Sequence, residues 1–128
     1  MFKRNKSEAP RRSRDGLTSH ILLQRGDVAD GRLSVTWIDV APGAARHEHT
    51  HLPEQVYVII RGTGLVRVGN EEQEVTTGDL VYIPPNALHS ITNTAEQVLS
   101  YFSAATPAFY LAAPYDTRPL HGAAGERL

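Results

Sequence analysis

The segment ARHEHTHLPEQVYVIIRG, residues 45–62, places three histidines within five positions and continues, after a glutamine, into the apolar run VYVII. Alternate side chains of an extended chain point to the same side, so His49, His51 and Gln55 are predicted to converge on one face of a sheet. His47 shares their parity. The polar outer face of an edge strand would give the same histidine pattern, but the apolar run that follows has to lie in a core. The segment therefore predicts a strand that carries candidate metal ligands into a protein interior.

The rest of the chain is predicted to be all-β, with almost no support for a helix. Runs rich in Val, Ile, Thr, Tyr and Trp alternate with Gly, Pro, Asn and Asp at a spacing of about ten residues, which is typical of a sandwich or barrel. Gly69-Asn70 and Gly78-Asp79 are expected at tight turns, because glycine readily adopts the positive φ that such turns need. The expected strands are residues 32–40, 55–61, 64–69, 73–77, 80–83, 89–93 and 97–103.

Length and composition limit the possible classes of protein. The 128 residues suffice for one domain, and the absence of cysteine leaves only nitrogen and oxygen as metal ligands. No apolar run approaches the roughly 20 residues of a membrane span. We therefore predict a protein with no membrane partner, and we place it in the cytoplasm because no apolar signal segment follows the basic N-terminus.

The two ends of the chain are expected to differ from the middle. Residues 1–14 hold six Lys or Arg and one Glu, and without a recognition module for nucleic acid this stretch is predicted to be a solvated tail rather than a nucleic-acid contact. We assign residues 1–16 to a basic, mobile arm, residues 17–118 to a barrel and residues 119–128 to a C-terminal tail.

A second histidine follows a rigid turn later in the chain. Pro84 and Pro85 must end the strand before them, and His89 then heads a new strand, which can hold a further ligand in a fixed position. Together the two segments resemble the cupin family. The first cupin motif is matched by Gly43, His49, His51, Gln55 and Gly62, and the second by Gly78, Pro84, Asn86 in place of glycine, His89 and Asn93. The resemblance implies a cupin jelly-roll β-barrel with a metal ion inside it.

Gln55 stands where most cupins have a glutamate. An amide can bind a metal only through its neutral oxygen, so the divalent ion would keep its full positive charge and attract anionic oxygen from a substrate. Imidazole-rich ligation suits zinc, which we prefer, and also iron, nickel or copper, with manganese possible.

The full candidate set is also similar to the site of small bacterial cupins that cyclise aromatic polyketides, the resistomycin-type cyclases, which hold zinc with four histidines and one glutamine. His47, His49, His51, Gln55 and His89 would supply that set. This resemblance implies a Lewis-acid cyclase that closes a ring by aldol-type attack and loss of water in a small aromatic or polyketonic substrate. His47 alternatively supports a ligand or contacts substrate, and together with Tyr57 it is a candidate catalytic residue.

Parity predicts which other side chains line the barrel. Tyr57 and Ile59 follow Gln55 onto the inner face, and Ile91 follows His89. The Tyr57 hydroxyl is expected to reach a substrate ketone. Further possible wall residues are Tyr82, Trp37 and Phe102, whereas His20 and His121 lie outside both motifs and are predicted at the surface.

Three other functions stay open. If His47 does not bind the metal, two positions on the ion are free, as a cupin dioxygenase of flavonols or β-diketones requires. A sugar-acid isomerase would need an arginine that faces inward, and Arg46, Arg61 and Arg67 are candidates with no clear inward direction. A binding cupin without turnover is the third. The family resemblance suggests a homodimer in every case.

Overall fold

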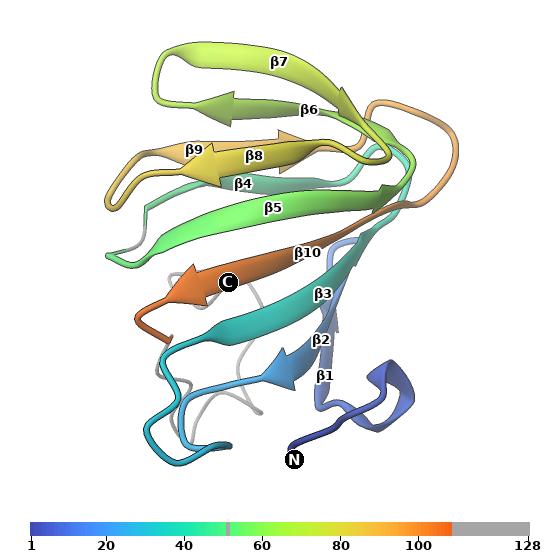
Figure 1. Cartoon of the computed structure of the whole chain (residues 1–128). Coiled ribbons are helices and arrows are strands. Elements are labelled where there is room, and N and C mark those ends of the chain that lie inside the picture. Colours follow the sequence, from blue (N-terminus) through green and yellow to red (C-terminus); the bar gives the residue numbers. More distant parts are fainter. Residues whose placement is uncertain (51, 109–128) are drawn as a thin grey trace.

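The computed structural model describes residues 1–50 and 52–108, which form two antiparallel sheets that face each other (Figure 1). The strand order is β1-β2-β3-β10-β5-β8 in the larger sheet and β4-β9-β6-β7 in the smaller one. The elements are η1 (Lys6–Glu8), β1 (Arg11–Arg14), β2 (Leu17–Leu23), β3 (Ser34–Val40), β4 (Ala45–His49), β5 (Glu54–Arg61), β6 (Thr63–Val68), β7 (Glu71–Thr76), β8 (Leu80–Ile83), β9 (His89–Thr92) and β10 (Leu99–Thr106). The predicted all-β jelly-roll barrel is confirmed. No helix among the described residues is long and apolar enough to cross a membrane.

The expected turns are found where the chain reverses. Gly69 and Gly78 adopt φ values of 60° and 96° after β6 and β7. Asn86, which replaces a glycine in the second motif, has a φ of 63°, and asparagine tolerates this region better than most residues. Gly62 needs its small size as well as its φ of 91°, because a Cβ there would lie 2.7 Å from the carbonyl oxygen of Val98.

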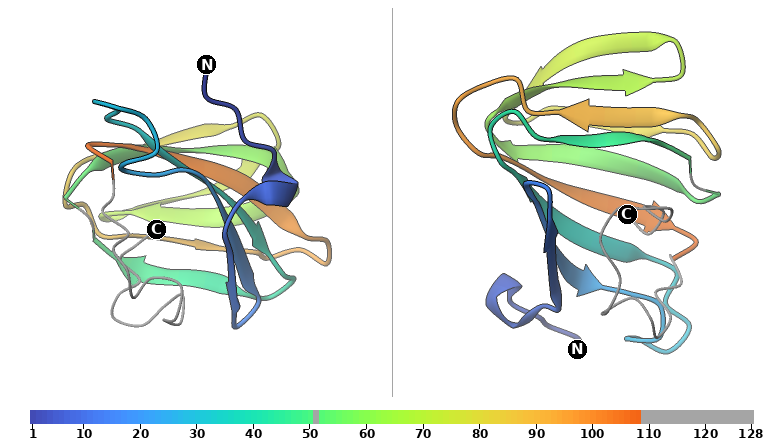
Figure 2. Two further views of the ribbon diagram at one scale, coloured as in Figure 1. Left: turned by 90° about the horizontal axis from the view of Figure 1, so that it is seen from below. Right: turned by 180° about the vertical axis from the view of Figure 1, so that it is seen from behind.

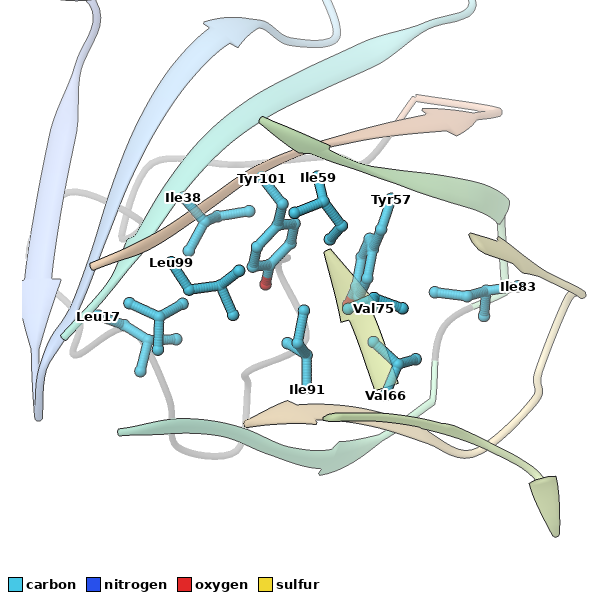
Figure 3. Packing of buried hydrophobic residues seen from close by; sticks show 11 residues of the cluster. Leu17, Ile38, Tyr57, Ile59, Val66, Val75, Ile83, Ile91, Leu99 and Tyr101 are labelled. Carbon is cyan, nitrogen blue, oxygen red and sulfur yellow. The ribbon is translucent and has the colours of Figure 1, made fainter. Parts of the chain in front are cut away.

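Apolar side chains from both sheets fill the space between them (Figure 3). Tyr57, Ile59 and Ile91 are each at most 1% exposed, which confirms the prediction that they point inward. The core cluster consists of Leu17, Ile38, Val40, Tyr57, Ile59, Val66, Val75, Ile83, Ile91, Leu99 and Tyr101. Burial of this many large side chains is the main source of stability for a domain of this size.

Three aromatic residues predicted as possible walls lie instead on the outer face of the larger sheet. Trp37 and Phe102 form a cross-strand pair between β3 and β10, next to the inward pair of Ile38 and Tyr101. Tyr82 is 51% exposed. These predictions were wrong because the inward positions of β3, β10 and β8 have the opposite parity.

The N-terminal segment, predicted as a mobile arm, lies against the sheet in the structure (Figure 2). Strand β1 pairs with β2 along its whole length. Arg4 donates to an Asp27 carboxylate oxygen at 2.8 Å, and Lys6 Nζ lies 4.6 Å from the centre of the Trp37 ring. Arg4 and Lys6 thus connect this segment to the rest of the fold. The predicted tail and the end of the predicted barrel lie outside the described residues.

Candidate metal centre

Three of the predicted ligands meet at one end of the barrel interior. His49 ends β4 and pairs directly with His89, the first residue of β9, and their ring centres lie 4.1 Å apart. Gln55 lies near the start of β5 in the opposite sheet, and its Nε2 is 3.1 Å from His89 Nε2. Gln55 and His89 are 2% and 1% exposed. The structure therefore brings a histidine pair and an amide together across the two sheets.

Both histidines are oriented by backbone carbonyls. His49 Nδ1 lies 2.6 Å from the carbonyl oxygen of His47, and His89 Nδ1 lies 2.8 Å from that of Ala87. A carbonyl can only accept, so each Nδ1 carries a proton, and a ring in its neutral form then has its lone pair on Nε2. Histidines that bind metals show the same arrangement, in which the second ring nitrogen donates to a carbonyl or carboxylate.

The electrostatic environment keeps His89 neutral. Burial lowers the pKa of His89 and the nearby Arg46 charge lowers it further, whereas the Ala87 carbonyl works in the opposite direction. A neutral imidazole is the form that binds a metal ion. His89 is therefore available as a ligand at neutral pH.

The Gln55 amide is held from its other side by Ser103. The Ser103 hydroxyl donates to Gln55 Oε1 at 2.9 Å, while Gln55 Nε2 donates to His89 Nε2. Metal binding through Oε1 requires the amide to turn, so that its oxygen lies where Nε2 lies in this structure. Ser103 permits both orientations, because a hydroxyl can accept from Nε2 as readily as it donates to Oε1.

His47 does not join this group. Arg46 pairs with Ile91 and His49 pairs with His89, so three steps along β4 match two steps along β9. This shift in register is a β-bulge at residues 47–48, both of which are exposed. The bulge turns the His47 ring outward, against the simple alternation from which an inward ring is predicted.

The same bulge brings Arg46 inside the barrel. Ile91 and His89 are buried and inward, and directly paired residues of an antiparallel sheet share a face, so Arg46 is inward as well. Arg46 is only 5% exposed. Of the other two arginine candidates, Arg61 is exposed at the end of β5, and Arg67 is exposed with its Nε 3.8 Å from a Glu48 carboxylate oxygen. A glycine would have indicated a bulge of one common type, and residues 45–51 contain none.

Tyr57 lies between the histidines and the barrel core. Its ring centre is 5.9 Å from that of His89, in an edge-on arrangement, and 4.6 Å from that of Tyr101. Burial raises the pKa of Tyr57 to about 12, with the Arg46 charge and a contact to the Tyr101 hydroxyl as smaller opposing effects. Tyr57 is therefore a neutral phenol that can donate a hydrogen bond.

The donor set fits a divalent transition metal. His49 and His89 offer imidazole nitrogens with the correct proton on the far side of each ring, and Gln55 adds an amide oxygen. The predicted ligand His51 lies outside the described residues. Within residues 1–50 and 52–108, no group of three His, Cys, Asp or Glu side chains forms a metal site without it.

Comparison with known sequences places these motifs in a family. The family model described as "Cupin domain" matches residues 36–104, more than half of the chain. An uncharacterized protein of Streptomyces coelicolor is 28% identical over 104 residues, which cover 80% of this chain and 93% of the relative. An uncharacterized protein of Methanocaldococcus jannaschii is 36% identical over 63 residues, 49% of this chain, and the match spans only 50% of that relative. The HTH-type transcriptional activator RhaR of Salmonella arizonae is 34% identical over 79 residues, 62% of this chain and 28% of its own length.

Solved structures agree on the fold. An RmlC-like cupin from Shewanella frigidimarina superposes with a TM-score of 0.73 at 20% identity, covering 84% of this chain and 92% of its own. A predicted oxalate decarboxylase from Thermotoga maritima superposes with a TM-score of 0.74 at 19% identity, covering 84% and 99%. At such identities the likeness concerns the fold alone. With the family match, both motifs and the two-sheet barrel in agreement, this chain belongs to the cupin family.

Proposed function

We propose that this cupin is a metal-dependent enzyme that closes rings in a polyketonic substrate of the aromatic polyketide class. His49, His51, Gln55 and His89 would hold one divalent transition metal, with zinc preferred and iron, nickel or manganese as alternatives. The observation that carries the proposal is the matched orientation of His49 and His89, each of which directs Nδ1 to a backbone carbonyl, as metal-binding histidines do.

The chemistry follows from the neutral ligand set. A divalent ion held by imidazoles and an amide would act as a Lewis acid toward a substrate carbonyl and make the neighbouring CH₂ more acidic. Ring closure by an aldol reaction forms one carbon–carbon bond, and the following dehydration releases one water. The chain's own contribution is to fold the substrate between apolar walls, which favours the reactive conformation. The neutral Tyr57 phenol would hold a ketone oxygen by a hydrogen bond.

The first test is metal binding. Purified protein should bind one zinc per chain, and X-ray absorption at the zinc edge should show only nitrogen and oxygen neighbours. His89→Ala should weaken zinc binding by more than the roughly 10–100-fold that is typical when a residue that merely orients a ligand is lost. His20→Ala is the matched control, because His20 lies on the outer face of the larger sheet and should leave zinc binding unchanged. Equal affinities in the two variants would contradict the proposed site.

The second test is turnover. The zinc-loaded protein should convert a synthetic poly-β-ketone to a cyclic product with loss of one water per ring, as measured by mass spectrometry. His89→Ala should abolish the conversion, whereas His20→Ala should retain it. A zinc-loaded protein that leaves the poly-β-ketone unchanged would rule out cyclisation and keep only the metal site.

One observation favours a second candidate, a cupin dioxygenase. The exposed ring of His47 leaves four candidate protein ligands instead of five, and an ion with about six positions would then have two open. Consumption of O₂ with a flavonol or β-diketone by the iron-loaded protein would favour this alternative. Homodimer formation and a cytoplasmic location stay predictions.

A further inference from the structure

Strand β5 is apolar on both of its faces. Within the run VYVII, residues 56–60, Tyr57 and Ile59 lie in the barrel core. The alternate residues Val56, Val58 and Ile60 therefore point to the outer face of the larger sheet, where each is only half-buried. A strand with one face in water normally alternates apolar and polar residues, whereas a continuous apolar run is typical of a strand that is covered on both faces. The sequence of β5 thus calls for a partner on its outer side.

The two neighbouring strands extend this apolar surface. Leu80 of β8 and Phe102 of β10 pair directly with Val58 from its two sides, and directly paired residues share a face. Tyr82 pairs with Val56 in the same way. Leu80 and Tyr82 are 60% and 51% exposed, so the described part of the chain leaves this side of β8 uncovered. The three strands lie side by side in the larger sheet (Figure 1). The outer apolar face consists of Val56, Val58, Ile60, Leu80, Tyr82 and Phe102.

The smaller sheet shows how a face in contact with water is built in the same protein. On its outer side, Arg67 of β6 lies between Glu72 of β7 and Ser90 of β9. Glu74 follows on the same face of β7. The apolar surface is therefore a specific feature of the larger sheet. Contiguous exposed apolar surface of this kind marks a site of interaction.

The two ends of β5 carry opposite charges on this outer side. Glu54 begins the strand, and its carboxylate accepts a hydrogen bond from the Tyr82 hydroxyl at 2.6 Å. Arg61 ends the strand and donates to the Ser100 hydroxyl at 3.3 Å. Both residues are exposed, and the residues of β5 between them are uncharged. Such a surface is complementary to a copy of itself that runs in the opposite direction, because Glu54 then meets the partner's Arg61 at each end.

We propose that a second copy of the chain covers the outer apolar face, so that the predicted homodimer forms by face-to-face packing of two larger sheets. The two-fold axis crosses β5 close to Val58, and the two β5 strands run antiparallel across the interface. Sheets packed in this way lie about 10 Å apart, with strand directions within about 30° of each other. An axis along β5 would instead place Glu54 against the partner's Glu54, and like charges would repel.

The first test is the oligomeric state of the full chain, measured by sedimentation equilibrium over a wide range of concentrations. Wild type should form a dimer. Val58→Glu brings two carboxylates together near the axis and should raise the dissociation constant at least about 100-fold. Ser90→Glu is the matched control, because it adds the same charge to the outer face of the smaller sheet, and it should leave the constant unchanged. A wild type that stays monomeric, or a Val58→Glu variant that dimerises like wild type, would overturn the proposal.

The second test fixes the direction of the two strands by disulfide cross-linking, which is specific because the chain has no cysteine of its own. Glu54→Cys and Arg61→Cys in one chain should give disulfide-linked dimers on mild oxidation. The two positions are seven steps of about 3.3 Å apart along one strand, too far for a bridge within the chain. Glu54→Cys alone should give no linked dimers. Linked dimers of this single variant, or a double variant that stays unlinked, would contradict the antiparallel arrangement.

The interface and the metal centre are tested separately, because the outer apolar face lies on the opposite side of the sheet from Gln55. Val58→Glu should bind zinc as wild type does, which also verifies that the variant is folded. If it does not fold, the cross-linking experiment still decides. A dimer that binds no zinc would reject the metal-dependent function and leave the interface, whereas a zinc-binding monomer would reject the interface and leave the metal centre.

Discussion

Two polar clusters lie on opposite faces of the larger sheet, and they differ in how their charges are balanced. On the outer face, the Asp39 carboxylate accepts hydrogen bonds from Ser100 at 2.6 Å, from Trp37 at 3.0 Å and from Lys6 at 3.3 Å, with His20 Nε2 at 3.4 Å. The carboxylate is saturated by donors of the chain itself, which is typical of a cluster that stabilises the fold.

The inner cluster is the opposite case. Around Gln55 and His89 lie an arginine, a neutral phenol and a serine, and the described residues contribute no buried carboxylate to it. Such a cluster combines imidazole nitrogen and amide groups that are suited to metal ligation. The comparison teaches that the outer cluster holds one part of the chain to another, whereas the inner cluster contains the residues that we propose as metal ligands.

The largest expected effect comes from placing a carboxylate in the inner cluster. Gln55→Glu should increase zinc affinity by about 10–100-fold, because an anionic ligand neutralises one unit of the ion's charge. Competition with a chelator of known affinity measures the change. Gln73→Glu, on the exposed face of β7, is the control and should have no effect. Equal changes in both variants would show that general electrostatics, rather than ligation at residue 55, governs zinc binding.

Removing the carboxylate from the outer cluster should have the next largest effect. Asp39→Asn leaves three donors with a weaker, neutral acceptor, and we expect unfolding in urea to become easier by about 1–3 kcal/mol. Zinc affinity should not change, because Asp39 lies on the outer face. Glu96→Gln, at an exposed loop position, is the control and should alter stability by less than about 0.5 kcal/mol. A loss of zinc binding in Asp39→Asn would show that the two clusters are coupled.

Most of the fold is predictable from the sequence for definite physical reasons. The alternation in residues 55–61 places Tyr57 and Ile59 inward, and Gly69 and Gly78 mark turns because their positive φ excludes most other residues. The two motifs predict that His49, Gln55 and His89 lie together. The reason is that each motif contains turns whose lengths fix the register of the strands that carry these residues. Strand β1 is not predicted, because a strand composed of Arg and Ser is recognisable only through its pairing with β2.

The part that the sequence does not reveal depends on a single inserted residue. Simple alternation through β4 predicts an inward His47 and an outward Arg46, and the bulge reverses both. Parity likewise misplaces Trp37, whose ring belongs to the outer cluster. His51, the remaining predicted ligand, and the tail from residue 109 lie outside the described residues, so those predictions stay as they are.

Acidification should weaken the outer cluster in two steps. Burial is the main cause that lowers the pKa of His20, and the Lys6 charge lowers it further. The contribution of neutral His20 to the free energy of unfolding is therefore complete above the ordinary pKa of 6.5. It is lost as the pH falls through the lowered pKa of the folded state. For Asp39, burial raises the pKa, but the hydrogen bonds from Ser100, Trp37 and Lys6 outweigh it and the net pKa is lowered. The contribution of the Asp39 carboxylate to the free energy of unfolding is complete above the ordinary pKa of 3.8, and it is lost as the pH falls through the lowered pKa of the folded state.

Urea unfolding at a series of pH values measures both steps. His89, whose pKa is also lowered by burial, contributes to the first step, and His20→Gln separates the two histidines. The variant should remove part of the first step and leave the second unchanged. A stability that rises on acidification between pH 6 and pH 4 would contradict the assignment of His20 as neutral in the folded protein.

The smallest expected effect tests whether the N-terminal segment is attached to the sheet at all. Lys6 lies over the Trp37 ring and donates to Asp39, so Lys6→Ala should reduce stability by about 0.5–1 kcal/mol. Trp37 is the only tryptophan of the chain, and its fluorescence should shift to longer wavelength as water replaces the lysine side chain. Lys3→Ala, at an exposed position of the same segment, should leave both quantities unchanged. If the two variants behave alike, residues 1–8 do not hold to Trp37 in solution, and the outer cluster stabilises only the sheet beneath it.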